Sequence, residues 1–108
     1  MNEPRYQLVI QFKLSDDDMA LQDEVLALED DLLEHLDPDL VDVDGHDAGS
    51  GEMNLFLFTN EPAAAFAQIK PIMTAHSLLD RSTAAYRPTD GEDFVPIWPE
   101  GLQTFEVV

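Results

Sequence analysis

The chain of 108 residues contains no cysteine and only five lysine and arginine residues. Without cysteine it can form no disulfide and no thiolate, which fits a reducing cytoplasm. The five basic residues stand against 23 acidic ones, and the net charge is −18. Phosphate binding requires clustered lysine and arginine, and anionic membranes repel an acidic chain. We therefore expect no nucleic-acid partner and no membrane partner.

Long apolar segments are also missing. No run approaches the roughly 20 apolar residues that span a bilayer. The N-terminus, MNEPRYQLVIQFKL, lacks the charged and apolar regions of a signal peptide. The apolar fraction of 44% is ordinary for a folded domain. We expect one cytoplasmic domain over residues 1–108, in which residues 94–108 form a C-terminal extension.

Two periodicities define the first part of the chain. Residues 6–14 alternate with period two, which predicts a strand with one buried face. Residues 15–36 predict a helix that Ser15 can cap. Its apolar stripe consists of Leu21, Val25, Leu28, Leu32 and Leu36. A second apolar line, spaced by seven residues, either widens the core contact or touches a second subunit; it consists of Met19, Leu26 and Leu33.

The remaining elements complete an α+β pattern. Short strands at residues 40–44 and 53–59 surround a turn at residues 49–51, and a helix begins near Pro62. Pro71 should kink that helix. Residues 82–87 predict a weak strand, and the C-terminal extension can add one more. The order β-α-β-β-α-β predicts a ferredoxin-like split βαβ fold, with an antiparallel sheet and both helices on one face.

The hairpin brings carboxylates, an imidazole and turn glycines together. With the loop at residues 48–51, alternation predicts that one strand face carries Asp42, Asp44 and His46, beside Met53, Leu55 and Leu57. The core-facing side would then carry Val41, Val43, Phe56 and Phe58. Two carboxylates and an imidazole can bind a divalent metal or act as an acid–base pair. The alternative is a structural role, because Asp and Gly are ordinary residues at hairpin ends.

No other motif indicates catalysis. Ser50 lies in a G-S-G turn without an evident base, and the lone G-x-G precedes a strand. We therefore predict no catalytic residue and no cofactor, and we favour a protein that is not an enzyme.

The segment GHDAGSGEMNLFLFTNEP, the proline-containing helix and AYRPTDGEDFVPIWP together cover about residues 40–99. This order of segments, with its GxDxGSGExN hairpin, resembles a group of small bacterial proteins. The resemblance implies a bacterial, single-domain, ferredoxin-like protein. It implies no activity and no functional residues.

Three functional hypotheses follow. The first is an interaction module that forms a homodimer, because the predicted face opposite the helices exposes Val9, Leu55 and Leu57. Trp98 either anchors a partner or is buried when the extension folds over its own sheet. The second is a metal-dependent enzyme or binder that uses Asp42, Asp44 and His46. The third is an inhibitor or immunity-type partner of a basic protein, since acidic residues dominate the first helix.

Overall fold

A computed structural model describes residues 5–14, 19–49 and 51–105. Its elements follow the order β1 (Tyr6–Lys13), α1 (Met19–His35), β2 (Val41–Gly49), β3 (Glu52–Thr59), α2 (Pro62–Ala75), the 3-10 turn η1 (Leu79–Arg81), β4 (Ser82–Pro88) and β5 (Val95–Trp98). The predicted succession of strands and helices is confirmed, and the C-terminal extension contributes β5. The predicted helix cap at Ser15 lies outside the described residues.

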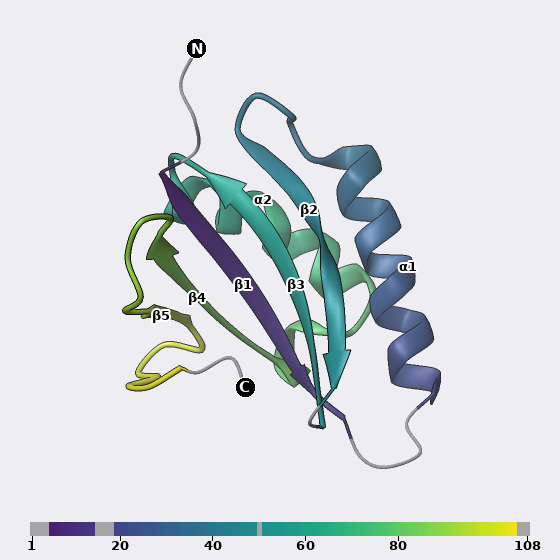
Figure 1. Ribbon diagram of the computed structural model, residues 1–108. Helices are drawn as coiled ribbons and strands as arrows, with labels where there is room; N and C mark the ends of the chain where they lie inside the picture. The colour runs from purple at the N-terminus through teal and green to yellow at the C-terminus, as the bar shows by residue number, and fades with distance from the viewer. Residues whose placement is uncertain (1–4, 15–18, 50, 106–108) are drawn as a thin grey trace.

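The strands form one antiparallel sheet in the order β2-β3-β1-β4-β5, and both helices cover the same face (Figure 1). The predicted α+β class, with two helices on an antiparallel sheet, is therefore confirmed. The predicted ferredoxin-like arrangement is not matched as a whole, because five strands are present. The additional strand β5 pairs with β4 and becomes the edge of the sheet.

The core lies between the helices and the inner face of the sheet. β1 contributes Leu8, Ile10 and Phe12 to it, all without exposed surface. The helices cover these residues with their apolar stripes, which consist of Leu21, Val25, Leu28 and Leu32 in α1 and of Ala65, Phe66, Ile69 and Met73 in α2. Removing these side chains from water is the main force that holds the helices on the sheet.

The predicted register of the hairpin is wrong. In the structure Val43 pairs with Leu57 and His46 pairs with Leu55, and a bulge lies between Val43 and Gly45. Directly opposed residues of an antiparallel pair share a face. Met53, Leu55 and Leu57 consequently enter the core, together with Val41. Phe56 and Phe58 occupy the outer face and are only partly buried.

The predicted interaction face is also wrong. Leu55 and Leu57 are 0% exposed because they face the helices, and Val9 is equally buried on the outer face of the sheet. Val9 pairs with Phe56 on one side and with Ala85 on the other. These residues of a single chain therefore offer no apolar surface to a second subunit.

The extension folds over its own subunit, as one of the two alternatives for Trp98 supposes. Trp98 pairs with Ala84 and is partly buried against the core. Its Nε1 donates to the carbonyl of Leu79 at 3.1 Å, and its ring centre lies 6.2 Å from that of Phe66. The Lys70 ammonium lies 4.5 Å from the same ring. Trp98 thus closes the core at the edge between β4 and α2.

α2 continues through Pro71 to Ala75. Pro71 is exposed, so its ring points away from the core that the same helix covers. Neither of the two described helices is long and apolar enough to cross a membrane.

We expect Trp98→Ala to lower the free energy of unfolding by about 2 to 3 kcal/mol, because it removes a partly buried aromatic side chain and its hydrogen bond. Urea unfolding followed by circular dichroism measures the change. Val95→Ala in the same strand is the control, since Val95 is 45% exposed and should cost less than about 0.5 kcal/mol. Equal costs for the two substitutions would show that Trp98 does not close the core.

Candidate binding surface

The rotation of α1 about its axis determines what the protein presents to solvent. Its buried stripe of Leu21, Val25, Leu28 and Leu32 packs on the inner face of the sheet. With 3.6 residues per turn, the opposite surface of the helix must then face water. α1 lies beside β2 at one side of the molecule (Figure 1).

Three large apolar side chains of α1 are exposed. Met19 is 71% exposed, Leu26 39% and Leu33 59%. These residues, here called the apolar row, lie about 130° around the helix from the centre of the buried stripe. The alternative in which they widen the core contact is therefore wrong. Scattered apolar residues are common on surfaces, but an aligned set along one helix indicates a contact surface.

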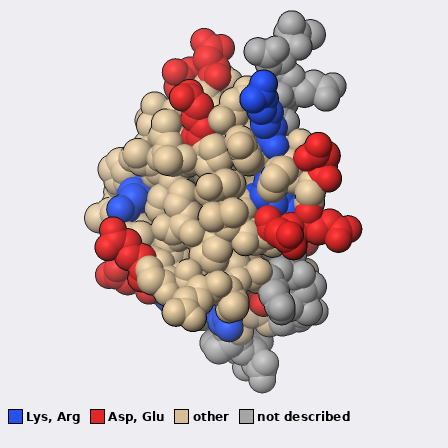
Figure 2. All heavy atoms as spheres, turned by 90° about the vertical axis from the view of Figure 1, so that its left-hand side faces the viewer, with Lys and Arg blue, Asp and Glu red and all other residues tan. Residues whose placement is uncertain are grey.

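Acidic residues dominate the segment that carries the apolar row. Residues 19–49, which cover α1 and β2, contain eleven Asp and Glu residues and no Lys or Arg. Asp23 and Asp30 follow Met19 and Leu26 by four residues each, so they flank the row, and both are exposed. We call the exposed surface of α1 and β2 the acidic face. The opposite side of the molecule differs: Figure 2 shows charged residues around a largely uncharged centre.

Two histidine contacts fix α1 to its neighbours. His46 of β2 points to the helix side, and its Nδ1 lies 2.9 and 3.0 Å from the two carboxylate oxygens of Glu29. At the other flank of α1, His76 lies directly after α2. Its Nδ1 is 3.0 Å from Glu24, and its Nε2 is 2.5 Å from Asp31. Each contact joins segments that are distant in the sequence.

The second contact changes the chemistry of the imidazole. Hydrogen bonds to Glu24 and then to Asp31 raise the pKa of His76 above its usual value, and partial burial opposes them. Both carboxylates stabilise the protonated ring. The charged form of His76 therefore strengthens the contact between α1 and the end of α2.

The predicted metal ligands do not share a face. Asp42 pairs with Phe58 on the outer face, whereas His46 pairs with Leu55 and turns toward α1. Asp44 occupies the bulge that separates them. The prediction of a site from Asp42, Asp44 and His46 fails because the bulge reverses the alternation on which it depends.

Among the described residues, a different group brings metal-ligating atoms together. Asp31, Glu34 and His35 place one ligand atom each within 4.8 Å of one another. Their spacing of three and four residues on a helix was a signal available in the sequence. Glu34 and His35 are exposed, and Asp31 also contacts His76. A cation here would compete with that imidazole for Asp31.

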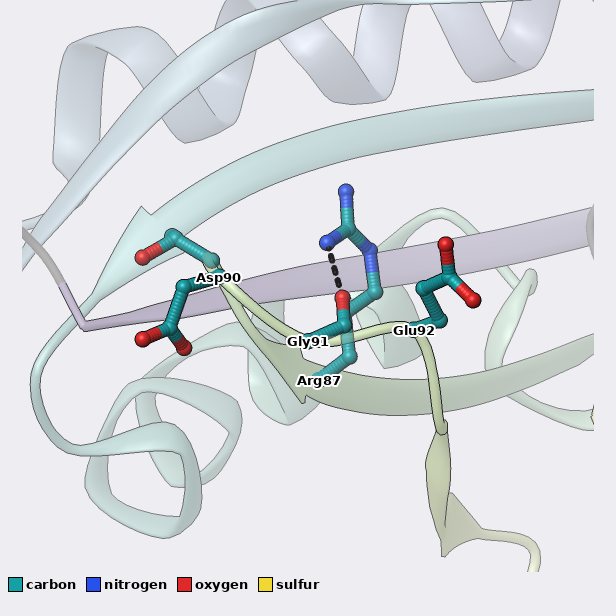
Figure 3. Close-up of a pocket in the computed structure, with 5 residues that line it drawn as sticks. Arg87, Asp90, Gly91 and Glu92 are labelled. Atoms are coloured by element: carbon teal, nitrogen blue, oxygen red, sulfur yellow. Dashed lines mark hydrogen bonds between the residues drawn. The ribbon is translucent and has the colours of Figure 1, made fainter.

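Two hollows on the described surface have structural explanations. One, of about 470 Å³, lies at the loop after β4 (Figure 3). There Arg87 donates to the carbonyl of Gly91 at 2.7 Å and to that of Pro88 at 3.2 Å, so its guanidinium holds the loop. Figure 3 shows the side chains of Asp90 and Glu92 on either side of it.

The second hollow, of about 540 Å³, lies on the outer face of the sheet beneath Leu102 and Phe105. Gln11 forms part of its lining and begins a chain of hydrogen-bonded side chains. Gln11 Nε2 donates to Asn54 at 3.2 Å, and Asn54 Nδ2 donates to Asp47 at 3.0 Å. Because these buried amides bond one another, their hydrogen-bonding groups already have partners within the chain and need no ligand.

Comparison with known proteins found no family model, no curated protein and no solved structure that matches the chain. Of the features described, the apolar row is the one set of large apolar side chains on a helix that takes no part in the core.

We expect His76→Gln to destabilise the protein by about 1 kcal/mol at pH 6 and by less at pH 9. The folded-state pKa of His76 is raised, so the imidazolium contributes fully to the free energy of unfolding below the unfolded-state pKa of 6.5. This contribution is lost as the pH rises through the folded-state pKa. Urea unfolding at both pH values measures it. His35→Gln, an exposed change on α1, is the control. A His76→Gln effect independent of pH would contradict the assignment.

Proposed function

We propose that this protein is a non-enzymatic interaction module that binds a basic polypeptide through its acidic face. The observation that supports this most is the combination of exposed Met19, Leu26 and Leu33 with the eleven acidic residues of segment 19–49. A surface on which charges of one sign predominate attracts an oppositely charged partner and rejects others. The apolar row supplies surface that binding would remove from water.

A second copy of the chain fits this surface poorly. Two acidic faces brought together would repel, because segment 19–49 contains no lysine or arginine to pair with the carboxylates. The residues that suggested a homodimer are Val9, Leu55 and Leu57, and all three are buried within one chain. We therefore favour a different, basic partner over self-association.

Neutralising a basic protein, as an inhibitor or immunity protein does, is the functional class that this surface fits best. The metal-dependent alternative has lost its support, since Asp42 and His46 lie on opposite faces of β2.

We also propose that the protein is bacterial and that its fold is a variant of the ferredoxin-like arrangement. Its supporting feature is that β1 lies between β3 and β4 while β5 only extends the β4 edge.

We expect an immobilised preparation of the protein to capture a basic protein from lysate of the source cells at about 0.05 M salt and to release it at about 0.5 M salt. The triple variant Asp23→Asn/Asp30→Asn/Glu34→Gln should capture several-fold less, because it removes three exposed charges next to the apolar row. Quantitative mass spectrometry of the bound fraction measures the difference.

The matched control is Asp90→Asn/Glu92→Gln/Asp93→Asn. It changes the net charge equally, at exposed positions in the loop between β4 and β5. This variant should capture as much basic protein as the unchanged chain. If both triple variants reduced capture to the same extent, net charge and not the acidic face would be responsible, and the proposal would be wrong.

A further inference from the structure

We infer that the partner binds as an amphipathic basic helix that packs lengthwise on α1. This inference rests on the proposed function and adds the conformation of the partner and the residues that receive it. The segment would present its own apolar residues to Met19, Leu26 and Leu33 and its lysines or arginines to the acidic residues beside them.

A heptad repeat in α1 carries the inference. Residues 19–25 read MALQDEV and residues 26–32 read LALEDDL. The apolar row occupies the first position of each heptad, with Leu33 opening a third, and Asp23 and Asp30 occupy the fifth. Apolar residues that recur every seven positions keep one line of contact along two crossing helices, and charges next to that line select the partner.

The length of the apolar row matches one partner helix. Met19 and Leu33 are fourteen residues apart, which corresponds to about 21 Å along the axis and to a partner segment of about 15 residues. Asp23 and Asp30 lie on the solvent side of the apolar row. Glu29 lies on its sheet side and is held there by His46. The exposed carboxylates of Asp23 and Asp30 would therefore pair with basic residues on one flank of the partner's apolar stripe. Glu29 would not, because its side chain is only 12% exposed.

An extended segment fits less well. β2 is an edge strand and could in principle accept another strand, but a bulge interrupts it at Asp44. Bulges and charged side chains are the features by which edge strands resist pairing. Moreover, the apolar row belongs to α1, so strand addition to β2 would leave it exposed.

The test uses two synthetic peptides of 18 residues with the same leucine, alanine and lysine content. In one, leucine recurs at heptad positions and lysine flanks it; in the other, the order is shuffled so that no apolar face forms. Fluorescence anisotropy gives the affinity, and circular dichroism gives the helix content. The amphipathic peptide should bind at least tenfold more tightly than the shuffled one and should gain helix on binding.

Variants locate the contact. Leu26→Ser/Leu33→Ser should weaken binding of the amphipathic peptide at least tenfold, whereas Val95→Ser should not change it. Val95 is the matched control because it is an apolar residue at the β5 edge, away from α1, and its exposure of 45% lies between those of Leu26 and Leu33. All three positions are exposed, so the variants should fold, and thermal unfolding verifies this.

The outcomes separate the two proposals. Suppose that both peptides bound with equal affinity and that only Asp23→Asn/Asp30→Asn lowered that affinity. The proposal of helix packing on the apolar row would then be wrong, while the proposal that basic chains bind through the acidic face would stand. If neither peptide bound and no salt-sensitive basic protein were captured from lysate, the proposed function would fail as well.

Discussion

Burial of the α1 stripe against the inner face of the sheet is the constraint on which the rest of the structure depends. Leu28 and Leu32 have no exposed surface, and they share the core with Leu55 and Leu57 of β3. A helix with that stripe buried has only one rotation available. The same rotation places Met19, Leu26 and Leu33 in water, so the binding surface is a consequence of the core.

The sequence predicted most of the elements because their periodicities are strong, but it could not determine the hairpin register. β3 carries apolar residues on both faces, with Leu55 and Leu57 on one and Phe56 and Phe58 on the other. When both alternating sets are apolar, hydrophobicity does not select the buried set. The bulge at Asp44 then moves His46 to the helix side, which alternation alone cannot anticipate.

The candidate surface was predictable only in part. The spacing of Met19, Leu26 and Leu33 and the excess of acidic residues are visible in the sequence, but exposure follows only from the packed structure. The contacts that hold α1 in place were not predictable. His46 meets Glu29 across 17 positions, and His76 meets Glu24 across 52, so they depend on tertiary structure. These contacts restrain both flanks of α1 and leave its apolar row free.

The central claim is that α1 carries the binding surface, and nuclear magnetic resonance tests it most directly. Backbone amide and side-chain methyl signals would be followed while a basic amphipathic peptide is added to the labelled protein. The account predicts that the largest shifts occur at Met19, Leu26 and Leu33 and at neighbouring acidic residues of α1, with β5 and the outer face of the sheet unchanged. Shifts centred on Trp98, or on the hollow beside Gln11 and Thr83, would contradict it.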